Sequence, residues 1–168
     1  MAFSFVGIFL AEKGPLQNPV GGFTIHEILG HLIWGLVAGA AALSVRYFIL
    51  TGLFAILIDS DHLIGLLHVD AVYKMSHSIS FGMISVVVLM ILFGKKDYRL
   101  AAAAMAGLLA HFSFDAFSGN DAKFPIFVPF YSHQISFPNT DWIYFEIAAV
   151  AIVGFCTIIT RKKESITA

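Results

Sequence analysis

Five apolar stretches, each close to the length that crosses a lipid bilayer, constrain the fold of this chain more than any other feature. A transmembrane helix needs about 20 mainly apolar residues. Of the 168 residues, 58% are hydrophobic and 12% are charged, with a mean hydropathy of +0.84, whereas a soluble domain carries about 25% charged residues. Much of the chain must therefore face lipid. We predict spans at about Thr24–Leu43, Arg46–Leu67, Ser76–Phe93, Arg99–Ser118 and Asp141–Thr160.

The predicted fold class is all-α. Inside a bilayer the protein must satisfy every backbone polar group itself, which leaves α-helices and closed β-barrels. The five stretches lack the alternation of apolar and polar residues that a barrel strand shows. The sequence therefore predicts a single integral membrane domain over residues 1–168, a polytopic bundle of about five transmembrane helices.

Basic residues predict how the bundle is oriented. If the two sides of the membrane alternate along five spans, most Lys and Arg residues fall on one side. The positive-inside rule assigns that side to the cytoplasm. We therefore expect an inner-membrane protein with its N-terminus outside and its C-terminus in the cytoplasm. The cytoplasmic set is Arg46, Lys95, Lys96, Arg99, Arg161, Lys162 and Lys163, and the outer set is Lys13, Lys74 and Lys123.

Histidines and acids gather at one predicted membrane level. They lie early in the first and third spans and late in the second and fourth, and these positions meet on the outer side. The segment from Arg46 to Asp59 covers about 20 Å at about 1.5 Å per helical residue, within a hydrocarbon layer about 30 Å thick. A site just inside the outer headgroups, facing the extracytoplasmic side, is therefore predicted. Its residues are Glu27, His31, Asp59, Asp61, His62, His77, His111 and Asp115.

These residue types favour a metal site. Carboxylates are costly inside a membrane and persist there when they are paired, solvated or bound to a cation. Mixed imidazole and carboxylate ligands suit zinc, manganese or iron. His111 and Asp115, four residues apart, share one helix face, as do Asp59 and His62, three apart. We predict a divalent metal, with zinc favoured, held by His31, Asp59, His62, His77, His111 and Asp115.

Two further acids are candidate catalytic residues. Glu27 lies four residues before His31, and Asp61 points away from Asp59 if the helix is regular there. Either acid could act as a general base or orient a metal ligand, unless the helix ends before Asp61. Hydrogen bonding between helices is an alternative role for the polar pairs. Membership of the site also stays open for His26, His68 and His133.

Three other patterns predict structure and not chemistry. Gly35 and Gly39 have the spacing of close helix packing. Cys156, the only cysteine, lies in an apolar run and is expected to be a packing residue. The aromatic and proline-rich segment 124–138 is expected to be a loop that anchors at the membrane interface.

Several short motifs follow one another in order along the chain. They are Gly30-His31, Asp59-Ser60-Asp61-His62, Ser76-His77-Ser78, Gly107-Leu108-Leu109-Ala110-His111 with Asp115, and Pro125-Ile126-Phe127-Val128-Pro129-Phe130. This ordered set, which covers about residues 24 to 138, resembles the YdjM family of inner-membrane, metal-dependent hydrolases. The resemblance implies a metal-dependent hydrolase in the inner membrane.

Two positions depart from the family pattern. Ile58 stands where family members have a proline, and Tyr73, followed by Lys74, stands where they have the first histidine of a His-Arg motif. If that histidine is a ligand in the family, this chain has one ligand fewer or recruits His68. A weaker likeness, in the His/Asp pairs on helices, is to zinc-dependent phospholipase C and implies phosphoester chemistry.

The sequence thus predicts a membrane-embedded, metal-dependent hydrolase with a phosphoester or lipid substrate. A metal-ion transporter is an alternative, although the apolar inner halves of the spans, such as 79–93, disfavour an ion pathway. A non-catalytic membrane assembly factor with a structural metal is another, although the chain offers more ligands than a closed site uses. With a net charge of -1 and no basic stripe, no nucleic-acid partner is expected. The oligomeric state is left open.

Overall fold

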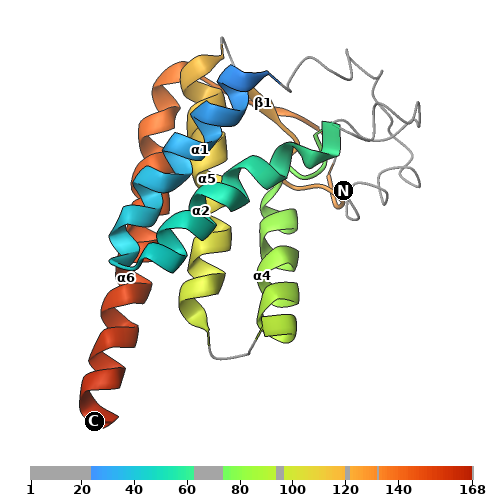
Figure 1. Ribbon diagram of the computed structural model, residues 1–168. Coiled ribbons are helices and arrows are strands. Elements are labelled where there is room, and N and C mark those ends of the chain that lie inside the picture. Colours follow the sequence, from blue (N-terminus) through green and yellow to red (C-terminus); the bar gives the residue numbers. More distant parts are fainter. Residues whose placement is uncertain (1–23, 63–73, 94–96, 120–121, 132, 168) are drawn as a thin grey trace.

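The computed structural model describes residues 24–62, 74–93, 97–119, 122–131 and 133–167 (Figure 1). Helices dominate this part of the chain, and the predicted all-α class is confirmed at this coarse level. The helices are α1 (Ile25–Gly39), α2 (Val45–Leu57), α4 (Ile79–Phe93), α5 (Tyr98–Ser118) and α6 (Trp142–Thr167). The shorter elements are the 3-10 segments η2 (Ala40–Ala42), η3 (Ile58–Asp61) and η4 (Asn139–Asp141) and the strands β1 (Ala122–Phe124) and β2 (Ile135–Phe137).

Three helical segments among the described residues are long and apolar enough to cross a membrane, by length and composition: Ile25–Ala42, Tyr98–Ser118 and Asn139–Lys163. Helix α4 is a shorter apolar helix. Helix α2 has 13 residues, so it is about 20 Å long and ends well before the predicted limit at Leu67. The last residues of that predicted span lie outside the described part. The count of five spans, their orientation and the single domain stay predictions.

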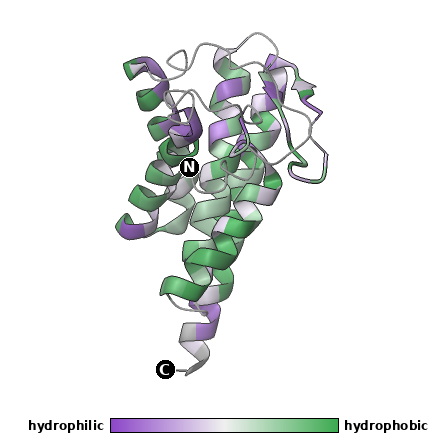
Figure 2. Ribbon diagram, turned by 90° about the vertical axis from the view of Figure 1, so that its right-hand side faces the viewer, coloured by the Kyte–Doolittle hydropathy of each residue, from purple (hydrophilic) through white to green (hydrophobic). Residues whose placement is uncertain are grey.

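Helix α5 is the centre of the bundle. It packs against α1, α2, α4 and α6, which surround it in Figure 1. Its buried side includes small residues such as Ala103 and Gly107, which let the other helices approach closely. Figure 2 shows hydrophobic residues along most of the helix lengths, and Ile33, Val87 and Ile147 are among those exposed. An exterior of this kind suits lipid better than water.

Glycines set how closely α2 approaches its two neighbours. A Cβ atom at Gly35 of α1 would lie 2.7 Å from the Cα of Gly52, and one at Gly107 of α5 would lie 2.6 Å from the Cβ of Phe54. A Cβ at Gly39 would lie 2.8 Å from the carbonyl oxygen of residue 48. Because no side chain fits at these points, α1 and α5 both lie directly against α2. The predicted packing role of Gly35 and Gly39 is confirmed.

A small antiparallel hairpin covers one end of the bundle. Strand β1 pairs with β2, with Lys123 opposite Ser136. The buried ring of Phe124 stacks on Phe112 of α5, with ring centroids 4.5 Å apart. The sequence predicted only a loop here, because a proline directly follows each strand and the support comes from a tertiary contact with α5. Between the strands, Phe130 is 90% exposed, as the predicted interfacial anchor requires.

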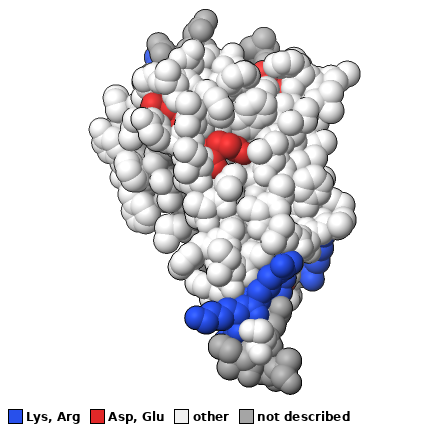
Figure 3. Space-filling view, turned by 90° about the vertical axis from the view of Figure 1, so that its left-hand side faces the viewer, with Lys and Arg blue, Asp and Glu red and all other residues white. Residues whose placement is uncertain are grey.

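Most of the described basic residues lie at the end of the bundle opposite the hairpin. Near the start of α2, Nη2 of Arg46 is 3.4 Å from Oδ2 of Asp97, and near the end of α6 Arg161 donates a hydrogen bond of 3.1 Å to the carbonyl of Leu43. Figure 3 shows most of the Lys and Arg side chains of the face it draws at this end, below the acidic side chains visible on the same face. Described residues of the predicted cytoplasmic set therefore share one end of the molecule.

Candidate metal centre

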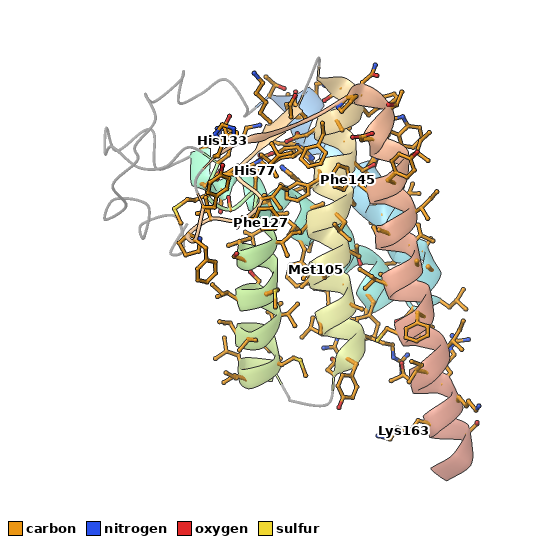
Figure 4. The ribbon with its side chains drawn as sticks, turned by 180° about the vertical axis from the view of Figure 1, so that it is seen from behind. His77, Met105, Phe127, His133, Phe145 and Lys163 are labelled. Carbon is orange, nitrogen blue, oxygen red and sulfur yellow. The ribbon has the colours of Figure 1, made fainter. Side chains whose placement is uncertain are left out.

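Eight ionisable side chains from four segments of the chain meet at the hairpin end of the bundle. Figure 4 shows one of them, His77, at the same end as Phe127 and far from Lys163. The structure thus brings together every residue that the sequence analysis assigned to the site. The His/Asp cluster, as we name it, comprises Glu27 and His31 of α1, Asp59 and Asp61 of η3, His62, His77 before α4, and His111 and Asp115 of α5.

Helix α1 begins so that its two site residues face α5. The hydroxyl of Thr24 accepts a hydrogen bond of 3.1 Å from the backbone N–H of Glu27, a contact that threonine favours at a helix start. His31 follows one turn later and is buried. Its ring meets Phe114 edge-on, with centroids 4.8 Å apart, and stacks on the ring of His111. These contacts hold the imidazole of His31 in one orientation.

The segment that follows α2 places two acidic side chains in the cluster. The α-helix ends at Leu57 and continues as the 3-10 segment η3. Ser76 ties this segment to the turn before α4, because its hydroxyl donates to the carbonyl of Ile58 at 2.8 Å and its backbone N–H donates to Oδ2 of Asp61 at 3.2 Å. The tighter turn lets Asp59 and Asp61 both reach the cluster. Of the possibilities that the sequence left open, the α-helix has therefore ended before Asp61.

A main-chain acceptor orients the ring of His111. Its Nδ1 lies 2.8 Å from the carbonyl oxygen of Ala55. Because a carbonyl oxygen can only accept, Nδ1 carries a proton and donates it. In the neutral ring, Nε2 is then unprotonated and turns its lone pair into the cluster. Histidines that bind metals are held in this way by a hydrogen bond from the other ring nitrogen.

His77 faces His111 across the centre of the cluster. The two Nε2 atoms are 2.9 Å apart, while Nδ1 of His77 lies 3.4 Å from Oδ2 of Asp61. A carboxylate oxygen beside Nδ1 favours the proton on that nitrogen. Both Nε2 atoms then direct lone pairs into the same space. Such lone pairs repel each other unless a proton or a metal ion lies between them.

Most spacings in the cluster suit metal ligands better than hydrogen bonds. Nε2 of His31 is 3.3 Å from Oδ2 of Asp59 and 3.4 Å from Oδ1 of Asp115. Nε2 of His111 is 3.6 Å from Oδ1 of Asp59 and 3.6 Å from Oδ2 of Asp115. Hydrogen bonds between N–H and O are about 2.7–3.2 Å long. Metal–ligand bonds of about 2.0–2.2 Å place two ligands of a tetrahedral ion about 3.3–3.6 Å apart.

The charges in the cluster are poorly compensated by the described protein atoms alone. The side chain of Asp59 is 7% exposed, and Oδ2 of Asp115 is buried without a hydrogen-bond partner among the described residues. Buried acceptors without partners are rare in native proteins, and neighbouring carboxylates repel each other. A bound cation would remove both costs. The buried His/Asp cluster therefore has the composition and spacing to hold a metal ion.

Lys74 is a site residue that the sequence analysis did not identify. Its Nζ lies 3.7 Å from Oδ2 of Asp115 and 5.5 Å from the ring centroid of Phe124. Its backbone has a φ of 55° in the turn before α4, a left-handed conformation that few non-glycine residues adopt. The sequence signals were its place beside the Ser76-His77 motif and its position in the departure from the His-Arg motif, and neither predicts where its side chain points. Lys74 adds a positive charge at the edge of the cluster.

The three histidines whose role stayed open in the sequence analysis do not enter the cluster where they are described. His26 is exposed, with its ring centroid 5.8 Å from that of Phe114. His133 is exposed in the hairpin, 5.8 Å from the ring of Tyr131. His68 lies outside the described residues, so its recruitment in place of Tyr73 stays a prediction.

The described part of the chain is thus a mostly helical bundle of apolar character with a buried His/Asp cluster at one end. No protein-family model, curated protein or solved structure matches this chain. The resemblance to the YdjM family, which depends on short motifs in order, accordingly stays a prediction.

Proposed function

We propose that this chain is a membrane-embedded, metal-dependent hydrolase whose reaction centre is the His/Asp cluster. One observation carries the proposal: the buried imidazoles of His31, His77 and His111 surround the carboxylates of Asp59 and Asp115 at spacings typical of metal ligands. The YdjM resemblance points to the same class of enzyme. Zinc is the ion we favour, because mixed histidine and carboxylate sites are common for catalytic zinc.

The exposed edge of the cluster supports a catalytic role for the metal. The side chains of Glu27 and Lys74 are 29% and 19% exposed, while that of His111 is fully buried. Structural zinc sites are closed by four ligands, whereas catalytic sites keep one position for water or substrate. An edge formed by Glu27 and Lys74 leaves such a position accessible.

In phosphoester hydrolysis, the bound ion, Glu27 and Lys74 would each have a separate role. A bound divalent ion would lower the pKa of a coordinated water and polarise the phosphoryl group. Glu27 accepts the proton of the attacking water as the water oxygen bonds to phosphorus and the bond from phosphorus to the leaving oxygen breaks. Glu27 then passes this proton to the leaving alkoxide. The ammonium of Lys74 binds the anionic phosphoryl oxygens.

Asp61, the other candidate catalytic residue, has a positioning role in this scheme. Its Oδ2 accepts the backbone N–H of Ser76 and faces Nδ1 of His77 at 3.4 Å. Its side chain is 5% exposed, so it does not line the accessible edge. A carboxylate in this position orients the imidazole and raises its basicity as a ligand.

An apolar cavity supports a lipid phosphoester as the substrate. It has a volume of about 170 Å³ and lies between α2, α4 and α5, with Ile58, Ser85 and Leu108 in its lining. Ile58 of its lining immediately precedes Asp59 of the cluster in the chain. An acyl chain in the cavity would hold the headgroup ester at the exposed edge near Lys74. Burial of each methylene of such a chain contributes about 0.8 kcal/mol.

The proposed location is the inner membrane, with the cluster facing the extracytoplasmic side. The described residues of the predicted cytoplasmic set, which lie at the opposite end, support this orientation through the positive-inside rule. A cysteine in place of the exposed Phe130, in a Cys156→Ser background, should react with a membrane-impermeant maleimide in intact cells. Reaction with the maleimide only after permeabilisation would show that the cluster faces the cytoplasm.

A metal-ion transporter has less support than a hydrolase. Between the cluster and the basic end, the described residues form an apolar core that includes Ala38, Ala103 and Val153. An ion pathway needs polar or charged groups along its length. The polar groups of the cluster instead occupy one end of the bundle.

Metal analysis beside a hydrolysis assay tests the proposal. The protein is purified in detergent, washed with chelator, reloaded with zinc and assayed on a phospholipid. The wild-type protein should bind zinc stoichiometrically, and His111→Ala should lose metal and at least about 100-fold in activity, more than second-sphere changes cost. The exposed His26→Ala serves as the matched control and should behave as wild type. Absence of metal from the wild-type protein, or hydrolysis that survives metal removal, would contradict the proposal.

A further inference from the structure

The stacked rings of His31 and His111 restrict how the cluster can bind metal. Their centroids are 3.7 Å apart and their planes differ by 11°. A metal ion lies close to the plane of the imidazole that binds it, about 2.0–2.1 Å from the nitrogen. Two ring planes that are nearly parallel and about 3.7 Å apart do not intersect within one metal–nitrogen bond length of both rings. A single ion therefore cannot lie in both ring planes.

Two carboxylates divide their oxygens between the same two rings. Asp59 places Oδ2 3.3 Å from Nε2 of His31 and Oδ1 3.6 Å from Nε2 of His111. Asp115 places Oδ1 3.4 Å from Nε2 of His31 and Oδ2 3.6 Å from Nε2 of His111. Each carboxylate thus presents one oxygen to each ring, which is how a carboxylate bridges two metal ions.

His77 belongs to the side of His111. Its Nε2 is 2.9 Å from Nε2 of His111, 3.6 Å from Oδ1 of Asp59 and 3.7 Å from Oδ2 of Asp115. These are the two carboxylate oxygens that also face His111. Two imidazole nitrogens and two carboxylate oxygens therefore surround one position, and Nε2 of His62 lies beside it, 3.5 Å from Oδ1 of Asp59.

We propose that the cluster holds two divalent ions bridged by Asp59 and Asp115. His77 and His111 complete one position, and His31 is the further ligand of the other. Ions in the planes of the stacked rings would be separated by about the 3.5–4 Å of two-metal hydrolytic centres. The inference rests on the proposed function and narrows it, because two-metal centres of this separation serve phosphoester hydrolysis.

Glu27 lies beside the position of His31. Its Oε2 is 3.8 Å from Nε2 of His31, and its side chain is the most exposed carboxylate of the cluster. With one imidazole and two bridging oxygens, the position of His31 has three protein ligands. A site with three protein ligands leaves room for water, and here that opening faces Glu27.

Counting and coupling Mn²⁺ ions tests the inference without an activity assay. The detergent-purified full chain is stripped with chelator, reloaded with Mn²⁺ and desalted, and the metal is counted by elemental analysis and examined by electron paramagnetic resonance. The wild-type protein should hold two Mn²⁺ per chain with the spectrum of an exchange-coupled pair. His31→Asn should hold one Mn²⁺ with an uncoupled six-line spectrum. His26→Asn, on the same helix but outside the cluster, should match wild type.

The outcomes separate this inference from the proposed function. One uncoupled Mn²⁺ per wild-type chain would overturn the bridged pair and leave a metal-dependent hydrolase standing. Two ions without exchange coupling would also overturn it. No bound Mn²⁺ or Zn²⁺ in the folded wild-type protein would overturn both. Because the wild-type measurement is decisive alone, the test does not depend on whether His31→Asn folds.

Discussion

Nδ1 of His111 donates a hydrogen bond of 2.8 Å to the carbonyl oxygen of Ala55, and this contact joins α5 to α2 four residues before Asp59. The acceptor belongs to the main chain, so its position depends on how the two helices pack and not on the side chain at position 55. Gly107, one turn before His111, lets α5 approach α2 this closely. The geometry of the cluster therefore depends on how closely α5 packs against α2.

The first prediction concerns that packing. In Gly107→Val, the new Cβ would lie 2.6 Å from the Cβ of Phe54, so α5 must move away from α2 and His111 loses its acceptor. Overpacking of this kind costs about 1–3 kcal/mol, and we expect a lower melting temperature together with weaker metal binding. At Gly154 of α6 the nearest atom to an added Cβ is 3.8 Å away, so Gly154→Val is the control. Equal metal binding by both variants would contradict the link between packing and site.

The second prediction concerns Asp61. Asp61→Asn keeps an oxygen that accepts the backbone N–H of Ser76 but removes the negative charge beside Nδ1 of His77. Loss of such an orienting carboxylate typically costs about 10–100-fold in metal affinity, and we expect a decrease of that size in zinc titrations. Asp141→Asn, in η4 and outside the cluster, should leave affinity unchanged. If Asp61→Asn lowered turnover at unchanged metal affinity, Asp61 would be a proton-transfer group and not a positioning residue.

The third prediction concerns Glu27. If Glu27 is the general base, the Glu27→Gln substitution should reduce kcat by about 10²–10⁴-fold. The metal content should stay as in the wild-type protein, because the imidazoles and the two carboxylates proposed to bridge the ions remain. Steady-state kinetics and elemental analysis of the same preparation provide the measurement. A variant that loses metal in proportion to activity would make Glu27 a ligand in place of a base.

The fourth prediction concerns the apolar cavity. Ser85→Phe would fill it from α4 and displace part of an acyl chain; at about 0.8 kcal/mol per buried methylene, losing two methylene positions raises KM by roughly tenfold. The rate on a water-soluble, short-chain phosphoester should not change. Val87 lies on the same helix but outside the cavity lining and is 56% exposed, so Val87→Phe is the matched control. Equal loss on both substrates would argue against an acyl-chain site.

The convergence of the cluster could be predicted before its geometry was known. Helices that cross between two fixed levels place early residues of one span beside late residues of the next, so His31 and His111 were expected at one depth. The spacing of four between His111 and Asp115 likewise placed both on one face. These inferences need only periodicity and hydropathy, which are local properties of the chain.

Other features of the site could not be predicted in this way. The direction in which the Asp61 side chain points depends on η3. This segment is held by hydrogen bonds from Ser76, which lies fifteen or more residues after the residues it bonds. The side chain of Lys74 reaches Asp115 from a turn whose conformation no periodic pattern indicates. The hairpin forms because Phe124 packs on α5, a contact that the prolines around it do not reveal.

The sequence by itself determined the apolar helical character of this protein and the histidines and acids of its candidate metal centre, because composition and periodicity act along the chain. Only the tertiary structure decided which atoms face one another. The stacking of His31 on His111 and the division of the Asp59 oxygens depend on the rotation and separation of packed helices. Contacts between residues far apart in sequence set both quantities.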